Sequence, residues 1–167
     1  TSLIAPSIEV PNINNEDVFT KIRDINPEII VIWGGLIVKP HIISLARIAV
    51  NMHHGYCPYY RGTNCYFHAL LANDLSHIGI TIHEAVASVD AGRIYAVIQA
   101  DTSKKPSEFF RELNDTAFRA YVDIIKRLLK GETLPFTSQD LSLGKNYLLK
   151  EWTYTKRSQT AQALLTL

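Results

Sequence analysis

Three polar side chains stand at the ends of apolar stretches, in a pattern that could do chemistry. Asn51 and His53 follow the apolar residues 48–50 and are separated by one residue, and Asp90 lies in the turn 89–92. Alternate side chains of an extended chain point the same way, so Asn51 and His53 can address one point in space. A carboxylate brought near them would complete a set able to donate hydrogen bonds and move a proton. The same residue types are also common in turns and caps, where the backbone satisfies them, and spacing alone leaves both interpretations open.

The elements that must position these residues alternate between strands and helices. The run 29–33 is apolar on both alternating faces and ends at Gly34-Gly35, which predicts a buried, parallel strand covered on both sides. Ligands of open α/β sheets bind at the carboxyl ends of the strands, where Asn51 and His53 are expected. Further strands are predicted at 48–50, 78–82 and 94–98, and a helix at about 63–73.

The rest of the chain frames this sheet. The longest helix should begin at Pro106 and end just before Gly131, with one apolar stripe at three- and four-residue steps. Asn15 can cap a short helix through residue 24, after an irregular opening over residues 1–14. Beyond residue 134 the pattern weakens to a strand at 147–149 and a helix at 159–165. We therefore expect a catalytic domain over 1–134 and a short C-terminal extension over 135–167, in the α/β fold class.

Composition narrows the class of protein. A chain of 167 residues predicts one domain, and a net charge of +1 without a basic cluster makes nucleic acid an unexpected partner. We find no membrane span and no secretion signal, and Cys57 and Cys65 are too few for a disulfide framework, so the cytoplasm is the expected compartment. The histidines show no metal-binding spacing, and the adjacent His53 and His54 would point apart on a strand, so no metal is expected.

Three blocks of sequence, in order, resemble the formyltransferase family. The first is the string Asn51-Met52-His53-His54-Gly55 followed by Pro58 and Arg61-Gly62, which looks like the family's Asn-x-His signature. The second is 79–83 together with 89–94, and the third is the upstream segment 26–40. Members of this family include glycinamide ribonucleotide, methionyl-tRNA and amino-sugar formyltransferases and formyltetrahydrofolate hydrolase.

The resemblance implies a function and a fold. It implies a Rossmann-like formyltransferase fold, with a mostly parallel sheet and helices on both faces. It also implies transfer of a formyl group from 10-formyltetrahydrofolate to an amine, with Asn51, His53 and Asp90 as catalytic residues. In that reaction Asn51 and His53 would donate hydrogen bonds to the tetrahedral oxyanion, and Asp90 would help relay the proton from the amine.

The resemblance also implies where the folate binds. The pterin would lie against two loops, formed by Gly35, Leu36 and Val38 and by the backbone of Ala87, Ser88 and Val89. Leu36 and Val38 could equally be ordinary core residues. Arg61 could anchor an anionic substrate or the folate tail, or be an ordinary surface cation.

The chain departs from the family pattern at both ends. Family members begin with a strand, a phosphate-binding loop and a helix that this sequence lacks, so the fold is expected without its first strands. Exposed apolar sheet surface could then be covered by a homodimer or by a partner segment. The short tail disfavours transfer RNA and leaves a small-molecule amine, such as an amino-sugar nucleotide, as the expected acceptor.

Two alternatives use the same residues. A formyltetrahydrofolate hydrolase would release formate without an amine. A catalytically silent domain would bind folate or a protein and show no turnover.

Overall fold

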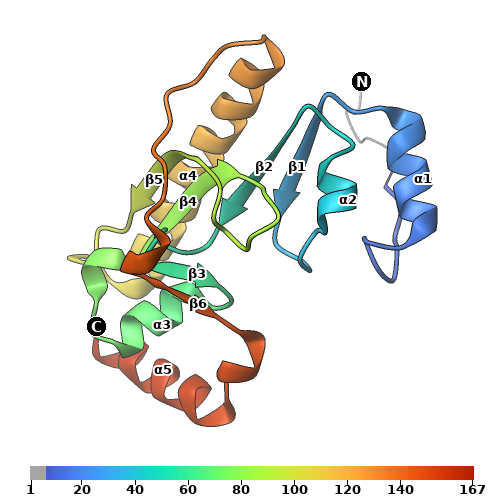
Figure 1. Ribbon diagram of the computed structural model, residues 1–167. Coiled ribbons are helices and arrows are strands. Elements are labelled where there is room, and N and C mark those ends of the chain that lie inside the picture. Colours follow the sequence, from blue (N-terminus) through green and yellow to red (C-terminus); the bar gives the residue numbers. More distant parts are fainter. Residues whose placement is uncertain (1–6) are drawn as a thin grey trace.

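A four-stranded mixed sheet forms the centre of the protein in the computed structural model, which describes residues 7–167 (Figure 1). Its strands lie in the order β1 (Ile29–Trp33), β2 (Ile48–His53), β4 (Gly79–Glu84) and β5 (Ile94–Gln99). β1 and β2 are parallel, whereas β4 is antiparallel to both β2 and β5. Three of the four strands therefore run in one direction, and the predicted α/β sheet is confirmed with β4 as the strand that runs against the others.

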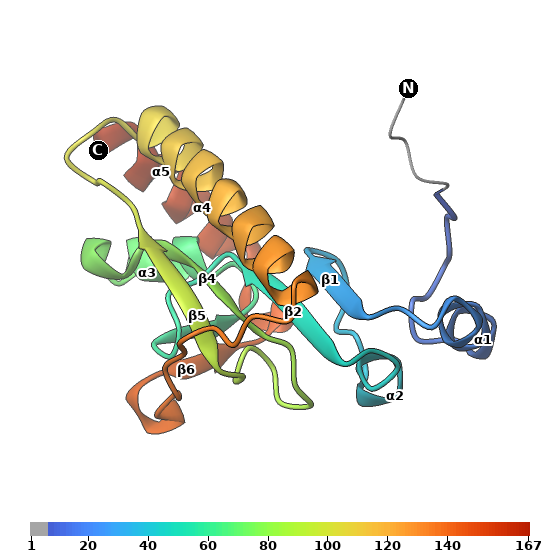
Figure 2. The same ribbon diagram turned by 90° about the horizontal axis from the view of Figure 1, so that it is seen from above.

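The long helix α4 (Pro106–Leu129) packs against all four strands on one face of the sheet (Figure 2). Its start at Pro106 and its apolar stripe agree with the prediction. The stripe is buried because it meets the sheet, and burying each large apolar side chain contributes about 1.5–3 kcal/mol. The buried residues of the helix are Phe109, Leu113, Ala117, Tyr121, Ile124 and Leu128.

Strand β1 has the predicted bounds and the predicted parallel pairing, but the prediction that it is buried was wrong. Val31 is 50% exposed and Trp33 is 60% exposed. The reason is its position, since β1 is the edge of the sheet and no strand pairs with its outer side within residues 7–167. An apolar run indicates that a strand has faces to be covered, but it does not identify the segment that covers them.

The N-terminal region lies beyond the β1 edge (Figure 2). Asn15 accepts a hydrogen bond from the Val18 N–H and caps α1 (Glu16–Ile25), as predicted. The irregular opening was predicted over 1–14, of which 1–6 lie outside the described residues and 7–14 contain no helix or strand. The short helix α2 (Pro40–Ile43), which precedes β2, was not predicted.

A second, smaller layer holds residues 135–167 against the rest of the chain. β3 (Tyr60–Gly62) pairs in parallel with β6 (Lys145–Tyr147), and α3 (Cys65–Leu71) packs against α5 (Tyr154–Thr166). The strand expected at 147–149 thus lies two residues earlier, and the last helix begins five residues before the predicted start. In the described part of the chain there are also three short 3-10 helices: η1 (Leu75–His77), η2 (Leu141–Leu143) and η3 (Leu149–Glu151).

Candidate active site

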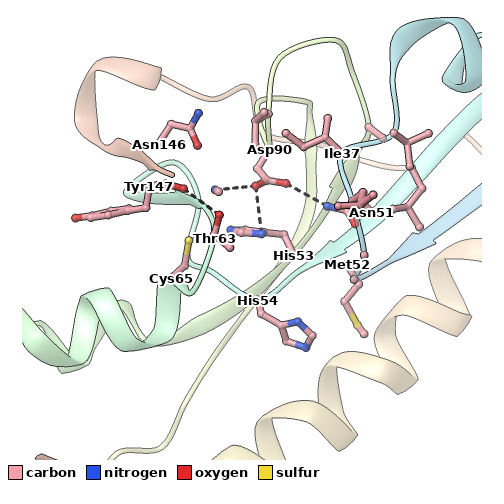
Figure 3. A pocket seen from close by; sticks show the side chains of 18 of the residues that line it. Ile37, Asn51, Met52, His53, His54, Thr63, Cys65, Asp90, Asn146 and Tyr147 are labelled. Atoms are coloured by element: carbon pink, nitrogen blue, oxygen red, sulfur yellow. Dashed lines mark hydrogen bonds and ion pairs between the residues drawn. The ribbon is translucent and has the colours of Figure 1, made fainter. Parts of the chain in front are cut away.

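Asn51, His53 and Asp90 meet at one point of the structure (Figure 3). Asn51 Nδ2 donates to Asp90 Oδ1 at 3.1 Å, and His53 Nδ1 lies 3.3 Å from Asp90 Oδ2. Asn51 and His53 lie at the carboxyl end of β2. Successive side chains of a strand point to opposite faces of the sheet, so these two, which are separated by one residue, both point toward Asp90. The structure therefore brings together the three residues that the sequence singled out.

His83 is the fourth side chain of this cluster. It lies opposite Asn51 in the antiparallel ladder of β2 and β4, and its Nδ1 lies 2.8 Å from the Glu84 carbonyl oxygen. Its Nε2 lies 3.2 Å from Asn51 Nδ2 and 3.3 Å from Asp90 Oδ1. With a proton on Nε2 the ring donates to the carboxylate, and without it the ring accepts from the amide. Asn51 thus donates to Asp90, and His83 contacts both residues.

The turn that carries Asp90 is fixed from several sides. Asp90 has a positive φ of 47°. The Gly62 N–H donates to its Oδ2 at 2.8 Å, and Gln139 Nε2 donates to the carbonyl oxygens of Asp90 and Gly92 at 2.9 and 2.7 Å. Gly92 lies so close to Glu84 that a Cβ there would overlap the Glu84 carbonyl oxygen. The carboxylate is held in place by both halves of the chain.

Burial and neighbouring charges have opposite effects on the pKa values of His53 and Asp90. Both ring nitrogens of His53 face oxygens, those of Asp90 and of the Tyr60 carbonyl, so both contacts are favourable only when the ring carries two protons. Burial opposes the second proton and lowers the pKa of His53, while Asp90 and Tyr60 act against that shift. Burial alone would raise the pKa of Asp90, but His83, His53 and the Gly62 N–H together hold it below its usual value. The carboxylate stays ionised and can receive a proton only through its neighbours.

The thiol beside the cluster is not a nucleophile. Cys57 Sγ lies 3.5 Å from the Asp90 carbonyl oxygen. Burial, followed by the charge of Asp90, raises the pKa of Cys57 to about 12. The thiol is therefore protonated near neutral pH.

The cluster forms the floor of a cavity of about 750 Å³, a size typical of ligand sites. One wall consists of the loops after β1 and β4, with Gly35, Leu36, Val38, Ala87 and Val89 in the lining. These are five of the six residues predicted to bind folate.

The sixth predicted folate-binding residue, Ser88, is exposed and does not line the cavity. Arg61 lies outside the lining as well, because its guanidinium donates to the carbonyl oxygens of Pro58 and Leu141, both at 3.3 Å. The structure therefore does not place Arg61 where it would meet a ligand in this cavity.

The loop wall offers free backbone groups to a ligand. Within residues 7–167, the backbone groups of Leu36, Val38 and residues 86–89 make no hydrogen bond. The side chains around them, including Leu36, Ile37 and Val86, are apolar and exposed. Apolar surface with unpaired backbone donors and acceptors suits a flat heterocycle that has polar edges.

The opposite wall comes from α3 and from the C-terminal extension. Thr63, Cys65, Asn146 and Tyr147 line it, and the Thr63 hydroxyl donates to the Tyr147 carbonyl oxygen. His54 points away from Asp90 toward α4, where its Nε2 lies 3.2 Å from Asn114 Oδ1 (Figure 3). The predicted divergence of His53 and His54 is confirmed.

Comparison with known proteins identifies the family. The family model described as formyl transferase matches residues 5–125, well over half of the chain. The chain belongs to the formyl transferase family. The predicted resemblance is thereby confirmed, and the cluster lies inside the matched region.

Individual relatives of this formyl transferase family member differ in what they act on. A methionyl-tRNA formyltransferase of Akkermansia muciniphila is 30% identical over 122 residues, which cover 72% of this chain and 38% of that protein. A likely sugar N-formyltransferase from Mycobacterium tuberculosis has a TM-score of 0.66 at 18% identity and covers 95% of this chain and 74% of its own. The formyltransferase PseJ from Anoxybacillus kamchatkensis, solved with a formamido sugar nucleotide and tetrahydrofolate, has a TM-score of 0.64 at 21% identity, covering 76% and 67%.

The formyl transferase chain described here spans about two fifths of the length of such curated relatives. Among residues 7–167, none of the helices has the length and hydrophobicity needed to cross a bilayer. In the same part of the chain no group of three or more metal-ligating side chains forms a candidate metal centre.

The sequence did not predict the residues that support the cluster in this family member. Gln139 left no signal, because a lone glutamine after a long helix has no characteristic pattern. Gly62 was noted only as part of the signature, although its φ of 90° marks a special backbone position. His83 ends the segment 79–83, and the structure places it against Asn51 and Asp90.

Proposed function

We propose that the protein is an N-formyltransferase that transfers the formyl group of 10-formyltetrahydrofolate to the amine of a small molecule. The observation that carries the proposal is the convergence of Asn51, His53 and Asp90 on the floor of one cavity, in a member of the formyl transferase family. An amide, an imidazole and a carboxylate around one point are the groups that acyl transfer to an amine needs.

The loop wall fits the folate. The pterin is a flat bicyclic heterocycle with an amide edge, and the wall supplies apolar side chains and free backbone groups. We propose that Gly35, Leu36, Val38, Ala87 and Val89 hold it. Tetrahydrofolate bound to PseJ supports a folate in this fold.

The first step would form a carbon–nitrogen bond. The neutral amine attacks the formyl carbon, and the carbonyl oxygen becomes an oxyanion. Asn51 and His53 would donate hydrogen bonds to it, and losing one such donor typically costs about 10²–10³ in rate. Asn51 Nδ2 donates to Asp90 and also lies 3.2 Å from His83 Nε2, so the reaction requires one amide hydrogen to turn toward the oxyanion.

The second step would break the bond between the formyl carbon and N10 of the folate. The attacking nitrogen loses a proton and N10 gains one, giving a formamide and tetrahydrofolate. Asp90 stabilises a proton on the cluster imidazoles and relays it directly or through water. His53 suits a transient proton carrier, because burial lowers its pKa while the charge of Asp90 favours its protonated form.

Both halves of the chain would take part. We propose that residues 1–134 form the catalytic domain and that the extension 135–167 completes the acceptor side of the cavity. The sugar nucleotide bound to PseJ favours an amino-sugar nucleotide as acceptor. The sequence relatives act on methionyl-tRNA, so that substrate belongs in the same assay.

We also propose that a second copy or a partner segment covers the exposed side chains of β1 in the full-length protein. Apolar patches that contain a half-exposed Val31 and Trp33 commonly mark contact surfaces. Light scattering after size exclusion should show a dimer if a second copy covers them. Cys57 and Cys65 are buried free thiols, which suits the reducing cytoplasm in which we place the enzyme.

The test measures tetrahydrofolate formed from 10-formyltetrahydrofolate by the full-length protein. The amines are the 4-amino precursor of the PseJ sugar nucleotide, glycinamide ribonucleotide and methionyl-tRNA. Asp90→Asn should lower the rate by about 10² or more while folate binding persists. Asp123→Asn, an exposed change on α4, is the matched control. Formate release in the absence of any amine would identify a hydrolase, and folate binding without turnover would identify a silent domain.

A further inference from the structure

Asn146 is a polar residue of the cavity wall whose oxygen lacks a partner. It lies in β6, in register with Arg61 of β3, and its side chain lines the cavity. Its Oδ1 is shielded from solvent and has no hydrogen-bond partner among the described residues. A buried carbonyl oxygen is costly to leave unpaired, so a bound molecule that donates to it would be favoured.

This oxygen is close to the catalytic floor. A Cβ built on Gly62 would overlap Asn146 Oδ1, so the oxygen rests against Gly62. The N–H of the same glycine donates to Asp90 Oδ2 at 2.8 Å. Asn146 and Asp90 thus flank one glycine, and Figure 3 draws both among the side chains that line the cavity.

The lining around Asn146 offers no positive charge. The Thr63 hydroxyl donates its proton to the Tyr147 carbonyl oxygen. No lysine or arginine is among the residues that line the cavity in the described part of the chain. A ligand group that meets Asn146 Oδ1 therefore meets an uncharged amide oxygen, which takes an N–H or O–H donor.

We propose that Asn146 Oδ1 accepts an N–H of the attacking amine and positions it against the formyl carbon; this inference rests on the proposed function. An amine must be neutral to attack, and a neutral amine has an N–H to donate while its lone pair faces the formyl carbon. An amide suits this position better than a carboxylate, because a second negative charge next to Asp90 would raise the pKa of both acids and favour the unreactive ammonium. The extension thereby contributes directly to the chemistry of the site.

The experiment uses the full-length protein, 10-formyltetrahydrofolate and the three amines of the transfer assay. Asn146→Ala should lower kcat/KM for the accepted amine roughly tenfold, mainly through KM, since one hydrogen bond to the amine is lost. Folate binding and formate release without amine should stay within about twofold of wild type, because neither needs the amine. Lys145→Ala changes the exposed neighbour on the same strand and should leave all three measurements unchanged. Thermal unfolding shows whether each variant is folded.

The outcomes separate the two proposals. Wild-type kcat/KM in a folded Asn146→Ala variant would overturn the role of Asn146 and leave formyl transfer standing. An equal fall in formate release without amine would also overturn it, because the residue would then act on the cluster and not on the acceptor. A wild-type protein that neither transfers nor releases formyl groups with any of these amines would overturn both proposals.

Discussion

The two polar surfaces of the cavity differ in how well their groups are satisfied. On the floor, Asn51 Nδ2, both ring nitrogens of His53 and both carboxylate oxygens of Asp90 have partners within the protein. On the opposite side, two residues of the lining carry a buried polar atom that has no partner among the described residues. These atoms are Tyr66 Oη and Asn146 Oδ1.

This difference separates chemistry from recognition. A satisfied network is rigid, so it keeps the reacting groups in place without a ligand. Unpaired groups cost stability until a ligand or water binds them. We therefore expect the residues of the floor to carry the proposed chemistry and the unpaired polar atoms of the opposite wall to bind the proposed amine acceptor.

The largest effect on the floor is expected from a substitution of Gly92. In Gly92→Ala the new Cβ would overlap the Glu84 carbonyl oxygen, and neither backbone segment can move without displacing the Asp90 turn. We expect a loss of about 1–3 kcal/mol in the free energy of unfolding, as is typical of overpacking, together with loss of formyl transfer. Chemical denaturation and the transfer assay measure the two effects.

Gly131→Ala is the comparison for that variant. Gly131 has a φ of 77° but nothing within 4 Å of a built Cβ, so the cost is backbone strain of about 1–2 kcal/mol alone. The rate per folded molecule should not change. A Gly92→Ala variant as active as Gly131→Ala would show that the turn does not need to be rigid.

A smaller effect is expected where the extension supports the floor. Gln139→Leu removes the hydrogen bonds to the Asp90 and Gly92 carbonyl oxygens but keeps most of the volume. Each lost hydrogen bond should cost about 0.5–1.5 kcal/mol, and the looser turn should slow transfer. The measurement is kcat of formyl transfer beside the free energy of unfolding, with exposed Gln159→Leu as control. If stability falls while kcat stays at the wild-type value, the extension stabilises the fold without positioning Asp90.

The smallest effect is the pH dependence of stability. Burial lowers the pKa of His68, which stacks on Tyr147 at 4.1 Å, and burial likewise lowers the pKa of His53 and His54. The unfolded chain therefore binds protons more readily than the folded one as the pH falls below about 6.5. Stability should be fully present above that pH and decline toward pH 5.5.

His68→Phe should show a shallower decline in the free energy of unfolding between pH 7.5 and 5.5. The aromatic contact with Tyr147 remains in this variant while the titrating group is gone. An unchanged slope would mean that the proton is accommodated at His68 in the folded protein.

The sequence predicted the floor because its residues are close in the chain or follow a recognisable order. Asn51 and His53 share one strand, and Asp90 ends the next hairpin, so period-two alternation and one turn suffice to bring them together. Strand β1 and helix α4 were likewise predictable from an apolar run and a helical stripe.

The wall formed with the C-terminal extension could not be predicted in the same way. Asn146 reaches the site through the pairing of β3 with β6, which joins residues more than 80 positions apart. Gln139 follows an isolated bridge between Thr137 and Ile94. The strand β6 is only three residues long, too short for a clear pattern. The exposure of β1 follows from its position at the edge of the sheet. That position could not be predicted from the sequence of the strand alone.

Asn51→Ala shows most directly whether the Asn51 cluster carries formyl transfer. The amide donates within the cluster and, as proposed, to the oxyanion, so its loss should remove transition-state stabilisation without removing the loops that bind folate. We expect tetrahydrofolate formation from 10-formyltetrahydrofolate to fall by about 10²–10³ while folate affinity is retained. Formation of tetrahydrofolate at the wild-type rate by Asn51→Ala would contradict that role of the cluster.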